Sequence, residues 1–388
     1  MRSKVSLVRC DNYQVESVYE AVKKSVDLLA PHFIRDNSRG NPERSEREGG
    51  MGAYVKTGQK VLIKPNLLSA KPPESGIDTH PEVVRAVIRL VKEAGGRVSV
   101  GDSPGGSVKK IADVYEGSGI AQVCREQDVP MLNFEKIEMF KNIPIARAAL
   151  KTDVLISVPK FKTHSLMTMT GGVKNLFGIV PGLFKTECHK RAPNPDIFAD
   201  LLVDVYSYAR PHLSVIDGII GMEGDGPASA GTLRQMDLIA ASGDAVSLDA
   251  VLAKIIGLEP FDISTTREAD LRGLGIGRLD YIDVVGEKLD NFVQSDFKLP
   301  KTSILHRIPS PVLKFIAGFF KVKPDVDQDK CKNCGICIKS CPKQAIAVKD
   351  GQIKIDYSKC ILCLCCHEFC PENAVFIKEN FFFRLIRS

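Results

Sequence analysis

The chain has 388 residues, of which 44% are hydrophobic and 26% are charged, a composition typical of globular proteins and not of disordered chains or disulfide scaffolds. The net charge of +6 is small and the basic residues are spread along the chain, so nucleic-acid binding is not expected. No apolar run reaches the roughly 18 residues of a membrane span, and the first residues lack a signal-peptide core, so we expect a cytoplasmic protein without a transmembrane segment.

The first 300 residues alternate strand-like and helix-like segments. Helical spacing of apolar residues occurs at 15–29, 79–96, 196–209 and 244–256, where Thr79 is the expected N-cap of the second helix. Strand patterns occur at 5–9, 60–64, 97–102, 153–158, 213–218 and 236–242. This alternation predicts an α/β domain over residues 1–300, with a mostly parallel sheet and helices on both faces.

Two stretches interrupt the pattern. Residues 35–53 are charged and glycine-rich, which predicts a flexible surface insertion without chemistry. Residues 301–324 form a connector whose apolar and basic part, 308–324, predicts a short helix at the domain junction. Alternatively, that helix and the tail at 381–388 make peripheral contact with a membrane.

Polar residues follow several predicted strands. In open parallel sheets, ligands bind beyond the carboxyl ends of the strands, so these loops are candidate site segments. The loop "PKFKTHS" supplies the candidate catalytic residues Lys160, Lys162 and His164. The candidate ligand-binding residues on the other strand ends are Lys64, Asn66, Asp102, Asp217, Glu223 and Asp225.

The richest stretch is "VPKFKTHSLMTMTGGVKNLFGIVPG". Here Gly171 and Gly172 precede Lys174 and Asn175. Glycines let backbone N–H groups approach an anion, and lysines supply positive charge, so an anionic small-molecule ligand is predicted. His164 could exchange a proton with it. The alternative that these residues are turns and solvated charges stays open.

Nine of the twelve cysteines fall between Cys331 and Cys370. The pattern C-x2-C-x2-C-x3-C-P starts at Cys331 and again at Cys360, and residues 345–355 between the two runs predict a hairpin around Asp350-Gly351. Such spacing is typical of iron-sulfur ligands, whereas two structural zinc sites or a chance duplication are the alternatives.

Residues 325–380 resemble bacterial ferredoxins that carry two 4Fe-4S clusters. The resemblance implies Cys331, Cys334, Cys337 and Cys370 as ligands of cluster 1, and Cys360, Cys363, Cys366 and Cys341 as ligands of cluster 2. Cys365 is left spare because it would break the two-residue spacer after Cys363, and its side chain is expected to point away from the ligands.

The segments "KPNLL", "THPEVVRAVI", "GDSPGG" and "DGIIGMEGDGP", with the glycine-rich stretch above, resemble the domain of unknown function 362 family. That family implies an α/β domain often fused to a two-cluster ferredoxin module, but no established reaction. A more distant likeness is to the nucleotide-cofactor domain of nickel-dependent lactate racemases.

The leading functional hypothesis is that the clusters receive electrons from a redox partner protein and pass them to an anionic substrate or cofactor, as in an iron-sulfur oxidoreductase. Whether the protein is an enzyme stays open. The alternatives are a binding or maturation protein with structural or redox-sensing clusters, and a racemase-like enzyme with a nucleotide cofactor.

Overall fold

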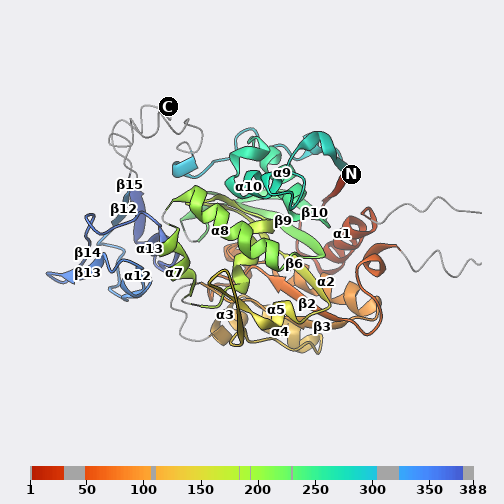
Figure 1. Cartoon of the computed structure of the whole chain (residues 1–388), viewed down its shortest axis with the longest axis horizontal. Coiled ribbons are helices and arrows are strands. Elements are labelled where there is room, and N and C mark those ends of the chain that lie inside the picture. Colours follow the sequence, from red (N-terminus) through yellow and green to blue (C-terminus); the bar gives the residue numbers. More distant parts are fainter. Residues whose placement is uncertain are drawn as a thin grey trace, which may run out of the picture.

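The computed structural model describes residues 2–29, 49–105, 111–182, 184–192, 194–228, 230–303 and 323–378. Within them, nine strands form one mixed sheet (Figure 1): β1 (Ser3–Arg9), β2 (Lys60–Pro65), β3 (Arg97–Val100), β6 (Val154–Val158), β7 (Lys160–His164), β8 (Thr168–Thr170), β9 (Leu213–Gly224), β10 (Gly231–Ser242) and β11 (Ile282–Gly286). The order is β11-β1-β10-β9-β6-β2-β3, and β7 pairs with both β8 and β9. Strands β4 (Ile137–Phe140) and β5 (Ile143–Ala146) form a separate hairpin.

Helices cover both faces of this sheet, because successive strand residues point to opposite sides and both sides are apolar. Val61 and Ile63 of β2 belong to one core, and Leu62 between them belongs to another. The first core contains α1 (Val15–Asp27), α2 (Pro81–Glu93), α3 (Ile111–Gly117) and α4 (Ile120–Glu126). The opposite side is packed by α5 (Arg147–Leu150), α6 (Gly172–Asn175), α7 (Phe184–Arg191), α8 (Pro195–Tyr208), α9 (Ala245–Ile255) and α10 (Ser264–Leu271). The predicted α/β fold is confirmed.

The N-cap predicted for α2 is wrong by one residue. His80 caps the helix, since its ring accepts a hydrogen bond from the Glu82 N–H at 3.2 Å. The Thr79 hydroxyl instead donates to the Val158 carbonyl at 2.7 Å and accepts from the Asn66 N–H at 2.8 Å. Thr79 therefore ties the loop after β2 to the end of β6.

The segment "PKFKTHS", predicted as a loop, is mainly strand β7. Its Lys160, Lys162 and His164 are buried, so it lacks the apolar alternation by which a strand is recognised. Likewise, β9 continues to Gly224, which places Asp217 and Glu223 on a strand and not in the predicted loop. These buried polar side chains form hydrogen bonds or ion pairs with other groups of the protein.

The small C-terminal domain consists of β12 (Lys323–Val326), α12 (Ile336–Lys339), β13 (Ile346–Lys349), β14 (Gln352–Ile355), α13 (Cys365–Glu368) and β15 (Val375–Lys378). β13 and β14 form the predicted hairpin, with Asp350 and Gly351 at positive φ, and β12 pairs with β15. Because β12 begins at Lys323, this domain starts within the range predicted as connector.

The predicted insertion lies largely outside the described residues, but its last part, Gly50–Ala53, forms a 3-10 turn in which Gly50 and Met51 are buried. Of the connector, 304–322 lies outside the described residues, as do tail residues 379–388. In the part of the chain that the structure describes, no helix is long and apolar enough to cross a membrane.

The small domain lies beside α7 of the large one (Figure 1). Helix α13 makes the junction: the His367 ring bonds the Asp225 carbonyl at 3.0 Å, and Glu368 reaches His164. A Cβ added at Gly105 would lie 2.7 Å from the Phe369 ring, so the backbone and the ring are in close contact there. The segment between two predicted cluster ligands, Cys366 and Cys370, therefore faces the large domain.

Candidate functional site

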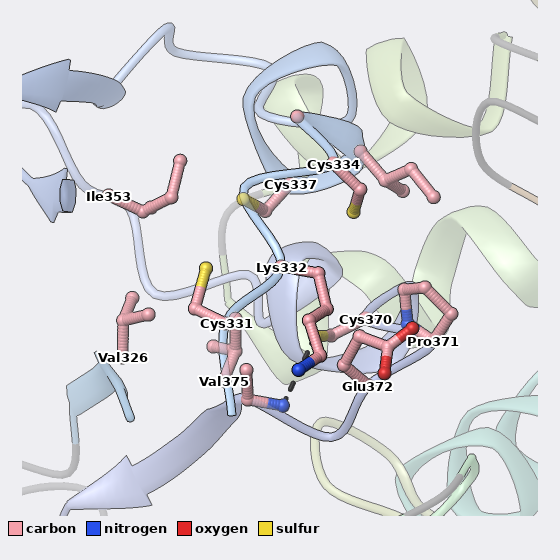
Figure 2. Close-up of a pocket in the computed structure, with 13 residues that line it drawn as sticks. Val326, Cys331, Lys332, Cys334, Cys337, Ile353, Cys370, Pro371, Glu372 and Val375 are labelled. Atoms are coloured by element: carbon pink, nitrogen blue, oxygen red, sulfur yellow. Dashed lines mark hydrogen bonds between the residues drawn. The ribbon is translucent and has the colours of Figure 1, made fainter. Parts of the chain in front are cut away.

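The cysteines surround two separate cavities in the small domain. Cys331, Cys334, Cys337 and Cys370 line the first, and Figure 2 shows three of them around the space with Cys370 approaching from the second half of the domain. The second cavity is lined by Cys341, Cys360, Cys363 and Cys366, together with Cys365. Each cavity thus draws three cysteines from one run and one from the other, in the sets that the ferredoxin resemblance implies.

The surroundings of the cysteines fit 4Fe-4S clusters. Ile346, Ile353 and Val375 form an apolar core with several of them, and the first cavity presents four cysteine sulfurs and the second five. The Ala345 N–H donates to Cys341 Sγ and the Ala374 N–H to Cys370 Sγ, both at 3.2 Å, so the two halves repeat the same N–H···S bond. Among the described residues, no three His, Cys, Asp or Glu side chains are arranged to hold a single metal ion. The cysteine sulfurs line the two cavities instead.

Cys365 does not point away from the ligands as expected. Leu364 has a φ of 61°, and the chain turns there into α13, so Cys365 lies against Cys363 and lines the second cavity. The hydrogen bond from the Cys365 thiol lowers the pKa of Cys363 below its ordinary value. Cys365 therefore lies beside cluster 2 as a neighbour of its predicted ligands.

In the large domain, four of the candidate ligand-binding or catalytic residues neutralise one another. Lys64 Nζ lies 2.8 Å from Asp102 Oδ1, and Lys160 Nζ lies 2.9 Å from Asp217 Oδ2. All four side chains are at most 1% exposed, so these are internal ion pairs. The Tyr13 hydroxyl also donates to Asp217, at 2.8 Å.

Lys162 is occupied as well. Its ammonium group donates to the Ile77 carbonyl at 2.6 Å, and it interacts with the carboxyl of the adjacent Asp78. Burial lowers the pKa of Lys162 to about 8 and raises that of Asp78 to about 7. Of the three catalytic candidates on β7, His164 is the one that lines a described cavity.

The backbone N–H groups at the glycine pair bind a carboxylate of the protein itself. Asp249 accepts from the Gly172 N–H at 2.6 Å and from the Val173 N–H at 3.1 Å. A Cβ at Gly171 would collide with that carboxylate, which explains the glycine there. The backbone beside Gly171 and Gly172 therefore binds a carboxyl group, as the glycine pair predicted. That group belongs to Asp249 and not to a free ligand.

Glu223 and Asp225 hold the end of the large domain in place. Glu223 accepts from the Lys298 N–H at 3.1 Å, and Asp225 accepts from the Lys301 N–H at 2.9 Å. Lys301 Nζ also lies 3.1 Å from the Asp225 carboxylate. Both acids therefore bind the segment that leads out of the large domain, and neither lines the cavity at the junction.

That junction cavity, of about 60 Å³, lies between the two domains. The large domain contributes Asn66, Asp102, His164, Thr170, Lys174, Asn175, Lys185 and His189 to its wall, and the small domain contributes Glu368 and Phe369. The sequence analysis missed Lys185, His189 and Glu368. The first two lie on α7 and the last on α13, which are not strand ends, so nothing in the local sequence connected them with the other residues.

Several polar groups of this cavity have no partner in the described structure. Lys174 makes no hydrogen bond or ion pair with any described residue, while Lys185 donates to the Ser103 carbonyl. Four buried atoms are also unpaired within the described residues: Asn66 Oδ1, His164 Nε2, Thr170 Oγ1 and His189 Nδ1. Unpaired polar groups in one cavity indicate a site for water or a polar ligand.

The protonation states of the cavity follow from its burial. Burial lowers the pKa of His164 to about 4 and that of His189 to about 3, so both are neutral at pH 7. His164 Nδ1 accepts from the Leu166 and Met167 N–H groups, so the proton of the neutral ring is on Nε2. Burial also lowers the pKa of Lys185 to about 8, against the charge of Asp102.

Glu368 is the acid that the small domain inserts among these groups. Its Oε2 lies 3.5 Å from His164 Nε2. Burial raises the pKa of this carboxyl, but the contact with His164 and the charge of Lys174 outweigh burial, so the pKa lies below its ordinary value. Glu368 is therefore a carboxylate. Apart from Asp102, which is paired with Lys64, it is the one acid in the cavity wall beside Lys174 and Lys185.

We predict that Cys366→Ser removes or converts one cluster, because Cys366 completes the second set, whereas Cys365→Ser keeps both. Iron and acid-labile sulfide of anaerobically purified protein should be about eight of each per chain in the parent and in Cys365→Ser. They should fall to roughly half in Cys366→Ser. Equal losses in the two variants would contradict the assigned ligand sets.

We predict that Gly178→Ala destabilises the large domain by about 3 kcal/mol, because the new methyl group would displace Asp102 and Lys64 and break their buried ion pair. Urea unfolding followed by circular dichroism measures the change. Gly49→Ala is the matched control, since a Cβ there meets no atom within 4 Å. Similar stability of the two variants would show that the ion pair tolerates the displacement.

Comparison with known proteins assigns the family. The family described as domain of unknown function (DUF362) matches residues 61–254, and a 4Fe-4S dicluster domain matches residues 323–371. A thylakoid-associated protein of Synechocystis is 36% identical over 282 residues, covering 71% of this chain and 81% of that protein.

Two solved structures give weaker matches. The lactate racemase apoprotein of Thermoanaerobacterium thermosaccharolyticum has a TM-score of 0.36 at 12% identity, covering 60% of this chain and 54% of that one. A Thermotoga maritima protein has a TM-score of 0.35 at 14% identity, covering 69% of this chain and 60% of that one. The match thus spans less than two thirds of each solved chain. On the family match and the Synechocystis relative, this iron-sulfur protein belongs to the domain of unknown function 362 family and carries a C-terminal 4Fe-4S dicluster domain.

Proposed function

We propose that the small domain holds two 4Fe-4S clusters and passes electrons to an anionic molecule bound in the junction cavity. One observation carries the proposal: Glu368 and Phe369, which lie between the cluster ligands Cys366 and Cys370, form part of the cavity wall. A ligand in the cavity would therefore lie next to the segment that connects the two clusters. Tethering the donor domain to its acceptor site gives electron transfer a high effective concentration.

The exposure of the cysteines supports a direction for the electrons. Cys334 of cluster 1 is exposed, whereas Cys366 of cluster 2 is buried. Cys365, which lines the second cavity, also interacts electrostatically with Lys174 of the junction cavity. A redox partner protein would then deliver electrons at cluster 1, and cluster 2 would donate them to the ligand.

Charge balance supports a singly charged anion. Lys64 and Asp102 neutralise each other, and the two histidines are neutral, so Lys174 and Lys185 face the single negative charge of Glu368. A monoanion would remove the remaining positive charge, which is costly to bury. The Nε2–H of His164 faces the Glu368 carboxylate at 3.5 Å, so this pair would supply the proton to a ligand that gains electrons, since proton uptake commonly accompanies reduction.

We predict that Lys174→Met weakens anion binding about ten- to hundredfold, because a charge-assisted hydrogen bond is lost. Small molecules retained after anaerobic purification are identified by native mass spectrometry, and the clusters are then reduced with dithionite. In the parent, the clusters should reoxidise as the retained molecule is reduced; in Lys174→Met they should stay reduced. Lys24→Met is the matched control, since Lys24 is an exposed lysine on α1 and lines neither cavity.

Two other results would change the conclusion. If the clusters of Lys174→Met reoxidise as fast as those of the parent, the cavity is not the electron acceptor site. If the parent retains a molecule that stays unchanged while the clusters cycle, the clusters sense redox state and the large domain only binds. The second result would favour a binding or maturation protein.

We predict that the affinity for acetate falls as the pH rises through about 8, by up to tenfold per pH unit. Lys185, whose pKa is lowered to about 8, is charged below that pH and pairs with the anion; above it the neutral amine does not. Calorimetric titration between pH 6 and 9 measures this. Lys185→Gln should bind acetate more weakly and lose this pH dependence. Lys162, whose pKa is also lowered to about 8, is still present in that variant, so the loss would identify Lys185 as the group that titrates. Tighter binding at high pH would contradict the assignment.

A further inference from the structure

A second, larger cavity opens on the surface of the large domain. Its volume is about 530 Å³, within the range of pockets that bind small molecules. Much of its wall is apolar and comes from Ile111, Phe134, Pro181 and Phe184. Ile111 and Phe184 are 37% and 48% exposed and both line this cavity, so their apolar surface is accessible to a ligand.

Helix α7 separates this outer cavity from the junction cavity. Phe184 and Glu187 line the outer cavity, whereas Lys185 and His189, four residues apart, line the inner one. Residues three and four apart share a face of a helix, so α7 presents Phe184 and Glu187 to one cavity and Lys185 and His189 to the other.

Ser103 belongs to the walls of both cavities. Its hydroxyl accepts from the Gly182 N–H at 2.9 Å, and its carbonyl accepts from Lys185. The boundary between the cavities at this point is therefore one buried serine and the lysine side chain that it binds. Ser103 is thus the point at which one ligand would have to reach from Lys185 to the outer cavity.

We propose that one ligand occupies both cavities: an anionic head, carboxylate or phosphate, among Lys174, Lys185 and His164, and an uncharged apolar body against Phe134 and Phe184. This deepens the proposed function, on which it rests for the anion site, by naming the class of molecule that the site binds. The apolar contact area adds affinity that the small inner cavity lacks.

The outer cavity also has two carboxylates in its wall, which select against negative charge on the ligand body. Glu135 accepts a hydrogen bond from Asn133 at 2.6 Å, and Glu187 has an exposed ion pair with Lys190 at 3.5 Å, which is weak in water. Both carboxylates line the outer cavity, so they disfavour a second negative charge on the ligand body. The site therefore selects molecules that are charged at one end only.

Calorimetric titration of the anaerobically purified holoprotein tests this with matched probes. Acetate is compared with octanoate, and inorganic phosphate with octyl phosphate, which also shows whether the head is a carboxylate or a phosphate. The octyl compound with the preferred head should bind roughly ten- to hundredfold more tightly than its short partner. Suberate, with a carboxylate at each end, should bind at least tenfold more weakly than octanoate, and Glu187→Gln should narrow that gap.

Phe184→Ser should reduce the affinity ratio of octanoate to acetate several-fold. Leu271→Ser, at a 73% exposed apolar residue on α10, should leave that ratio unchanged. If octanoate binds no more tightly than acetate, or if both variants change the ratio equally, the two-cavity ligand is wrong while the inner anion site stands. If none of the acetate, phosphate or octyl probes binds, the inner anion site and the proposed function are wrong as well.

Discussion

Burying ammonium groups at one end of a sheet requires a counter-charge for each, and this constraint shapes the large domain. Lys64 has Asp102, and Lys160 has Asp217, within 2.9 Å in each case. Removing one member of such a pair leaves an uncompensated buried charge, at a cost of about 3–5 kcal/mol. The constraint explains why β7 can be a strand although its inward side chains are charged.

Lys174 differs from these lysines because no described residue of its own domain pairs with it. The acid whose charge acts on it, Glu368, belongs to the small domain. The two domains are thus linked by an electrostatic requirement as well as by the His367 contact with the Asp225 carbonyl. The positive charge that remains after Glu368 is counted is the feature on which the proposal of an anion site rests.

The small domain is connected to this site through a short piece of chain. Residues 365–370 include a predicted ligand of each cluster, the Cys365 thiol beside cluster 2, and two wall residues of the junction cavity. Helix α7 plays the corresponding part on the opposite wall, since its two faces line different cavities. The proposed clusters and the proposed ligand would therefore contact adjacent groups, which is the arrangement that coupling between them needs.

The sequence by itself determined the fold class and the repeated cysteine pattern, because hydrophobic period and ligand spacing are local properties. The division of the cysteines into two sets was implied by the resemblance to ferredoxins. It also indicated basic and glycine-rich segments near strand ends. Only the tertiary structure decided what each polar residue contacts: Asp249 binds the N–H groups of Gly172 and Val173, and Lys160 is paired internally. The cavity joins β7, α6, α7 and α13, and Glu368 lies 204 positions from His164 in sequence. Charge compensation acts through space, so a chain read in order cannot show which lysine lacks a partner.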